Sequence, residues 1–178
     1  MRTERGFTLI ELVITIAVLA IALLFVAQGV KRGGEQGNSA LWQVKTVELA
    51  MMLMDELHGQ RYDEATALDQ PCRDAGVTAS LAPCGVTLGP EEASRDLYDD
   101  SDDLHGFNSR DGGDSLNDLL GGDLETQRKY AGYAVSVAVS YAGADFSRAP
   151  QDLKRITLYI FPPGQELSVA FSSYRGNY

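Results

Sequence analysis

The sequence is poor in basic residues, in histidine and in cysteine. Its 178 residues include 15 Lys and Arg against 25 Asp and Glu, and only two His and two Cys. A formal net charge of −10 leaves no basic surplus to neutralise phosphates. The charge therefore argues against a nucleic-acid partner and against electrostatic docking on an anionic membrane surface. The length predicts one domain of ordinary size.

The motifs that support catalysis are also missing. The glycine-rich stretch GGEQG, residues 33–37, lacks the Gly-Lys-Ser/Thr ending of a phosphate-binding loop. His58 and His105 stand in no recognisable nucleophile or metal arrangement. Asp residues are abundant, but they fall in a glycine-rich stretch that is poor ground for preorganised catalysis. The sequence predicts a protein that is not an enzyme and has no resident cofactor.

Uninterrupted hydrophobicity is confined to one block near the N-terminus. Residues 7–27 form a run of 21 residues whose only charged member is Glu11. As a helix this run would be about 32 Å long, enough to cross the hydrocarbon core of a bilayer. The short leader MRTERG precedes it.

Three interpretations of this block compete. A cleaved secretory signal has a hydrophobic region of roughly 7–15 residues, and this run is longer and charged. A plain membrane anchor leaves Glu11 unexplained, because a carboxylate in lipid costs at least about 2.5 kcal/mol, unless it snorkels to the interface. In the third interpretation, cleavage between Gly6 and Phe7 creates an α-amino group four residues before Glu11. That cation could neutralise Glu11 of a neighbouring subunit.

The stretch RGFTLIELVI, residues 5–14, closely resembles the type IV prepilin signature. The resemblance implies that a prepilin peptidase cuts after Gly6, that Phe7 becomes N-methylated, and that Glu11 is the assembly residue. It further implies a subunit held in the bacterial inner membrane by one helix, with a periplasmic head. After assembly through a pilus assembly platform, the helix would pack with other major and minor pilins in the fibre.

A glycine-rich segment separates this block from the rest of the chain. Residues 29–37 contain four Gly, each costing about 1 kcal/mol relative to Ala in a helix. We therefore expect a kink, a melted stretch or a flexible linker. The predicted organisation is a leader at 1–6, a transmembrane and filament-core helix at 7–28, a linker or kink at 29–38, and a head at 39–178.

The head is predicted to be an α+β domain. A helix over about 39–57 carries an apolar stripe, and three alternating segments at 133–141, 154–161 and 166–174 read as antiparallel strands with one buried face. The stripe comprises Val44, Val47, Met51 and Met54, with Ala50 and Leu57 beside it. This order matches the fold that the prepilin resemblance implies, a long N-terminal helix packed on an antiparallel sheet.

Cys72 and Cys84 are the only cysteines and lie among Pro and Gly. Two cysteines do not complete a zinc site. A disulfide fits better and implies an oxidising compartment such as the periplasm, which places the N-terminus in the cytoplasm. The alternative is a pair of free thiols in a cytosolic loop.

The negative charge is concentrated past the middle of the chain. Residues 90–125 hold 12 Asp and Glu and two basic residues. Oxygen ligands at this density could bind Ca²⁺, although the spacing is not that of an EF-hand loop. The first candidate ligands are Asp99, Asp100, Asp102 and Asp103. The alternative is a solvated acidic loop without metal.

Shorter stretches are similar to a narrower group within the prepilin family. AVLAIALL, the paired Cys, YDDSDDLHGF and AFSSYRGNY resemble a minor pilin, of the D type, from the mannose-sensitive haemagglutinin (MSHA) pilus system. The resemblance implies a subunit that helps to initiate or cap a pilus used for surface attachment. The alternatives are a minor pseudopilin of type II secretion and a monomeric membrane-anchored periplasmic binding module.

Overall fold

The computed structural model describes residues 8–64, 66, 71–72 and 83–177, apart from the side chains of residues 32–39 and 96. The regular elements, in chain order, are α1 (Leu9–Gly59), η1 (Arg95–Leu97), α2 (Leu116–Leu119), α3 (Leu124–Lys129), β1 (Ala134–Tyr141), η2 (Gly143–Phe146), η3 (Pro150–Asp152), β2 (Leu153–Phe161) and β3 (Val169–Gly176). The chain divides into two compact units, Met1–Trp42 and Gln43–Tyr178.

The glycine-rich segment is helical. The backbone of α1 continues from Leu9 to Gly59 through all of residues 29–38. The expectation of a melted stretch there is therefore wrong. Once a helix is nucleated, each further residue adds a hydrogen bond, so helix-forming residues on both sides carry propagation through the four glycines. A kink at these residues stays a prediction.

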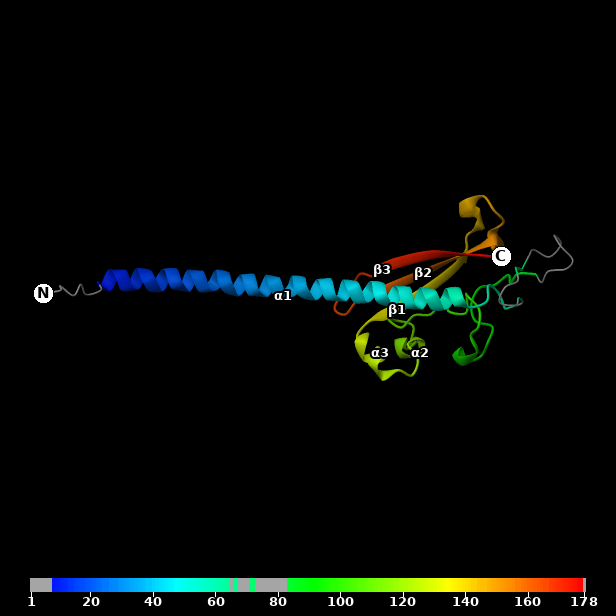
Figure 1. Ribbon diagram of the computed structural model, residues 1–178, viewed down its shortest axis with the longest axis horizontal. Helices are drawn as coiled ribbons and strands as arrows, with labels where there is room; N and C mark the ends of the chain where they lie inside the picture. The colour runs from blue at the N-terminus through cyan, green and yellow to red at the C-terminus, as the bar shows by residue number, and fades with distance from the viewer. Residues whose placement is uncertain (1–7, 65, 67–70, 73–82, 178) are drawn as a thin grey trace. The chain divides into compact units, whose positions relative to one another are not determined.

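The three strands form one antiparallel sheet in the order β1-β2-β3, beside the C-terminal part of α1 (Figure 1). Val137 pairs with Leu158, and Leu158 pairs with Phe171, so these three side chains share a face. The outer edge of β1 is covered by the segment around Asn108, which bridges to Ser136. This arrangement confirms the predicted α+β fold with a long N-terminal apolar helix.

The core of the head lies between α1 and the inner face of β1 and β2. Its fully buried members are Leu49, Leu53, Leu57, Val135, Val139, Ile156, Leu158 and Ile160. The predicted helix stripe is wrong in part, because Val44, Val47 and Met51 are 66%, 40% and 62% exposed. The helix is apolar on two faces, and periodicity alone could not tell which of them the sheet covers.

β3 also departs from the expected burial. The alternation of residues 166–174 puts Leu167, Val169 and Phe171 on one face, which we expected to be buried. Leu167 is 84% and Val169 37% exposed, and Phe171 is only half-buried. The alternation places Val169 and Phe171 on the same face as predicted. β3 is the edge strand, and the fully buried part of the core ends at β2, so its apolar side chains are covered incompletely.

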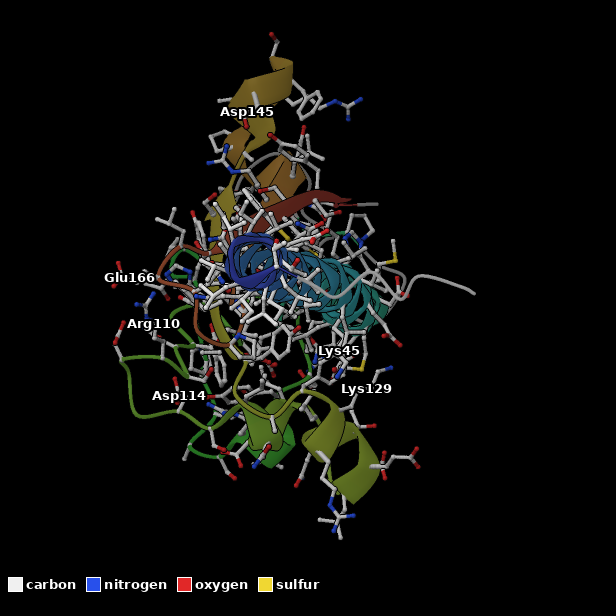
Figure 2. All side chains as sticks on the ribbon, turned by 90° about the vertical axis from the view of Figure 1, so that its left-hand side faces the viewer. Lys45, Arg110, Asp114, Lys129, Asp145 and Glu166 are labelled. Carbon is white, nitrogen blue, oxygen red and sulfur yellow. A yellow bond between two sulfur atoms is a disulfide. The ribbon has the colours of Figure 1, made fainter. Side chains whose placement is uncertain are left out.

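Surface contacts fasten the remaining loops to the head (Figure 2). Lys45 Nζ donates to the Lys129 carbonyl at 3.1 Å, while Lys129 forms an ion pair with Glu48. Arg110 Nη1 donates to the Glu166 carbonyl at 2.9 Å. Exposed pairs of this kind contribute about 0–1 kcal/mol each, so they position α3 and the β2–β3 connection more than they stabilise the fold.

Candidate functional site

The N-terminal part of α1 is apolar around its whole circumference. Leu9–Lys31 is the one candidate membrane span in the described chain, by length and composition. None of its apolar side chains is buried within the chain, and large ones such as Leu12, Leu19 and Phe25 are 53%, 57% and 70% exposed. An apolar surface of this extent needs lipid or other protein to cover it.

Glu11 lies in the first turn of this helix. Thr8 Oγ1 donates to Glu11 Oε2 at 3.4 Å, and the Thr8 carbonyl accepts the amide of Glu11 at 3.1 Å. The partial positive charge of a helix N-terminus favours a carboxylate there. Glu11 forms none of the salt bridges seen among the described residues. Gly6 and Phe7, the predicted cleavage and methylation residues, lie outside the described residues.

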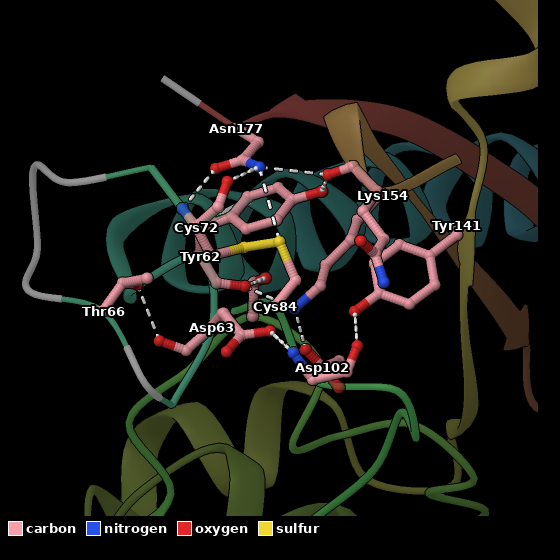
Figure 3. Close-up of a disulfide and its surroundings, with 12 residues drawn as sticks. Tyr62, Asp63, Thr66, Cys72, Cys84, Asp102, Tyr141, Lys154 and Asn177 are labelled. Carbon is pink, nitrogen blue, oxygen red and sulfur yellow. Dashed lines mark hydrogen bonds and ion pairs between the residues drawn. A yellow bond between two sulfur atoms is a disulfide. The ribbon is translucent and has the colours of Figure 1, made fainter. Parts of the chain in front are cut away.

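The predicted disulfide is present. Cys72 and Cys84 are bonded and lie 12 residues apart in sequence, both of them buried (Figure 3). Together with Tyr62 they form a small apolar cluster apart from the main core. The bond ties the two described ends of a loop to the body of the head and confirms the predicted pairing of Cys72 with Cys84.

Asn177 fastens the disulfide to the end of β3. Its Nδ2 donates to the Cys72 carbonyl at 2.7 Å, and its Oδ1 accepts the Cys72 amide at 2.9 Å. Nδ2 also lies 3.2 Å from the Gln151 carbonyl (Figure 3). Both the amide nitrogen and the oxygen of the Asn177 side chain are therefore hydrogen-bonded, so Asn177 helps to hold the loop that the disulfide closes.

Loss of the disulfide should destabilise the head. Because closing a loop of about this length contributes roughly 3 kcal/mol in the chain-entropy model, we expect the Cys72→Ser/Cys84→Ser variant to lose about that much unfolding free energy. Urea unfolding of the full chain in detergent measures it. Dithiothreitol should lower the stability of the native protein to that of the variant and leave the variant unchanged. Equal stability of native protein and variant would contradict this role.

A buried ion pair lies beneath the disulfide. Lys154 is 0% and Asp102 3% exposed, and Lys154 Nζ forms a salt bridge with Asp102 and donates to the Tyr62 carbonyl. The ammonium lies 4.7 Å from the centroid of the Tyr62 ring. Burial raises the pKa of Asp102 to about 6, against the opposing attraction of Lys154. The pair joins β2 to the acidic block through the interior.

Residues 100–104 of the acidic block are buried, whereas Asp111, Asp118, Asp123 and Glu125 are exposed, as in the solvated loop that we considered. Asp100 and Asp103 are each 2% exposed. Asp103 Oδ2 accepts the amides of Asp99 and Asp100 at 2.7 and 2.9 Å, and Asp100 Oδ1 accepts the amide of Asp102 at 2.8 Å. These carboxylates build a tight turn, because backbone amides in a short turn need acceptors when water is excluded.

The four predicted calcium ligands do not converge on one point. Asp99 forms a salt bridge with Arg61, Asp102 pairs with Lys154, and Asp100 accepts a turn amide. No three of these four residues bring carboxylate oxygens within 4.8 Å of one another in the part of the chain that the structure describes. The structure therefore does not support Asp99, Asp100, Asp102 and Asp103 as a single site.

Sequence reasoning missed the residues that organise this region, namely Tyr62, Lys154 and Asn177. One signal was available for Lys154. It shares the alternation of Ile156, Leu158 and Ile160 and therefore stands on the buried face of β2. A lysine at such a position needs an acidic partner, and the acidic block is the richest source of one.

The comparisons with known proteins support the prepilin motif that the sequence predicts at the N-terminus. Residues 1–27 match the family model described as the prokaryotic N-terminal methylation motif. No curated protein and no solved structure matches the chain. The match covers the leader, Gly6, Phe7 and Glu11 together with the apolar half of the anchor helix. The chain therefore carries a prepilin-type N-terminal methylation motif, which supports a place in the type IV prepilin family and indicates a structural subunit.

Proposed function

We propose that the protein is a minor pilin of a type IV pilus of the MSHA kind, anchored in the inner membrane before assembly and helping to initiate or cap a pilus for surface attachment. The observation that carries this proposal is the methylation motif in residues 1–27, which overlaps the apolar span Leu9–Lys31, where Glu11 is the only carboxylate. The resemblance of the head to D-type MSHA minor pilins supports the narrower assignment.

One helix serves two environments in this proposal. Before assembly the apolar surface of Leu9–Lys31 contacts lipid. In the fibre the same surface contacts the equivalent helices of other pilins, so apolar area stays out of water in both states. The carboxylate of Glu11 is costly in lipid and gains a cationic partner only in the fibre. The charge of Glu11 makes the unassembled state in lipid unfavourable. Neutralisation of this charge in the fibre therefore favours assembly.

The head offers a second surface for neighbours. Val44, Val47 and Met51 are exposed on α1 and line a shallow apolar hollow with Gln43 and Glu48. Methionine is a pliable side chain that suits contacts between surfaces. This face supports packing against the head or helix of an adjacent pilin.

Processing of the leader tests the proposal directly. Expressed with a prepilin peptidase, the protein should lose residues 1–6 and carry a methyl group on Phe7, as measured by mass spectrometry of the N-terminus. Gly6→Leu should leave the leader attached, because a bulky residue blocks the cleavage position, whereas the Gly6→Ala control should retain partial processing. A native protein that still begins at Met1 and is unmethylated would overturn the pilin assignment.

A second measurement separates the alternatives. Sheared pili should contain the processed protein in small amounts relative to the major pilin, and deletion of its gene should reduce the number of pili. Loss of type II secretion with normal piliation would instead show a minor pseudopilin. An unprocessed protein that remains in the membrane fraction would favour a monomeric binding module.

A further inference from the structure

Three carboxylates in the head lie together without a cation. One carboxylate oxygen from each of Glu91, Glu92 and Asp103 lies within 4.8 Å of the others. None of the salt bridges formed by the described residues includes any of them. Like charges at this spacing repel, and the repulsion is stronger where water is excluded.

Two carboxylate oxygens of these residues are buried and accept no hydrogen bond. Asp103 is 2% exposed; its Oδ2 accepts two turn amides, but its Oδ1 accepts no hydrogen bond. Glu92 Oε2 is likewise buried without a partner. An unsatisfied buried carboxylate oxygen costs several kcal/mol. Burial, with the nearby negative charges of Glu92 and Glu91, raises the pKa of Asp103.

The neighbouring arginines already form salt bridges, although Nε and Nη1 of Arg95 are buried and donate no hydrogen bond. Arg61 contacts Glu64 at 3.0 Å and pairs with Asp99. Arg95 Nη2 contacts Asp114 at 3.0 Å, and its guanidinium lies over the Phe107 ring. Glu64 and Asp99 therefore share Arg61, and Asp114 has Arg95, whereas Glu91, Glu92 and Asp103 enter no salt bridge among the described residues. A carboxylate oxygen of Glu92 also lies within 4.8 Å of oxygens of Glu64 and Asp99.

We propose that Glu91, Glu92 and Asp103 bind a Ca²⁺ ion. The ligand set consists of oxygens alone, which calcium prefers and which zinc and copper sites seldom use. Calcium ligands at about 2.3–2.6 Å can stand up to about 5 Å apart across the ion, which accommodates the 4.8 Å limit of this cluster. Exposed Glu91 leaves room for waters to complete the coordination.

The surrounding backbone holds the ligands in place. The Gly89 amide donates to Asp102 Oδ2 at 3.1 Å, which ties the segment before Glu91 to the turn that carries Asp103. Asp102 is in turn held by Lys154. A bound Ca²⁺ ion would add a second link between the segment of Glu91 and Glu92 and the turn that carries Asp103, so calcium should stabilise the head. This inference concerns the head alone and does not depend on leader processing.

Calcium titration of the full chain tests the proposal. After treatment with a chelator and dialysis in detergent, isothermal titration with CaCl₂ should show saturable binding, and calcium should raise the thermal unfolding midpoint. Glu92→Gln removes a ligand that makes no hydrogen bond in the described chain and should weaken binding at least tenfold. Glu91→Gln should weaken it several-fold. Glu125→Gln, an exposed acid on α3, is the charge-matched control and should bind within twofold of the native protein.

Near-ultraviolet circular dichroism without calcium should show that each variant keeps the native packing. Absence of saturable binding up to about 1 mM calcium, the weak end of the range for extracellular modules, would overturn the proposal. So would equal weakening by Glu125→Gln and Glu92→Gln, which would show nonspecific attraction to the acidic block. Tighter binding of MgCl₂ than of CaCl₂ would overturn the assignment to calcium.

Discussion

Replacing Lys154 with methionine should lower the unfolding free energy of the head by about 3–5 kcal/mol, because removing one partner leaves Asp102 buried without its counter-charge. Asp102 also keeps the Gly89 amide as a partner, but an amide does not neutralise a carboxylate. The variant also deprives the Tyr62 carbonyl of a donor. Urea unfolding of the full chain in detergent, followed by tyrosine fluorescence, measures the loss.

A matched lysine provides the control for this prediction. Lys129 pairs with Glu48 at the surface, where their side chains are 40% and 50% exposed. Lys129→Met should therefore cost less than about 1 kcal/mol. The double variant Lys154→Met/Asp102→Asn should recover part of the stability lost by Lys154→Met, because the orphaned charge is gone while an acceptor for Gly89 remains. Similar losses for Lys154→Met and Lys129→Met would contradict a buried ion pair.

Glu11→Val should abolish incorporation into filaments while leaving membrane insertion intact. Valine is favourable in lipid where a carboxylate is costly, so the variant should partition into the inner membrane at least as well as the native protein. It loses the only charge between Leu9 and Val30, and with it the proposed partner of a neighbour's methylated amine. The measurement is the ratio of variant protein in sheared pili to that in membranes.

Thr15→Val is the control for this experiment. Thr15 lies one turn after Glu11, and its hydroxyl donates to the Glu11 carbonyl at 2.6 Å. The control changes the polarity of the same part of the helix without removing a charge, and it should enter filaments normally. Incorporation of Glu11→Val into filaments at the native level would contradict the pairing of Glu11 with a neighbour's amine. This outcome would count against the pairing even when leader cleavage and methylation are normal.

Several features were predictable because they depend on neighbours in sequence. The apolar run of 7–27, the alternation of the β1 and β2 segments and the loop chemistry around Cys72 and Cys84 each follow from local composition or period. The signature at Gly6, Phe7 and Glu11 is also local, and the family match to residues 1–27 agrees with it. For these features a short window of sequence contains the physical cause.

The other features depend on which segments of the chain contact one another in the folded protein. Thr46, Leu49 and Leu53 form the buried face of α1, although Val44, Val47 and Met51 are at least as apolar. Period alone does not say which stripe meets the sheet. Similarly, Lys154 and Asp102 are 52 residues apart in sequence, and only their contact turns a supposed surface loop into a buried turn.

The same reason explains why the calcium ligands proposed from the structure differ from those predicted from the sequence. Composition determined that the block of residues 90–125 is rich in hard oxygen donors. Tertiary contacts committed Asp99, Asp100 and Asp102 to Arg61, a turn amide and Lys154, and left Glu91, Glu92 and Asp103 together. The sequence by itself determined an apolar helix long enough to cross a membrane, an antiparallel sheet and a disulfide. The tertiary structure alone decided which charges are neutralised, because charge pairing depends on distance in space.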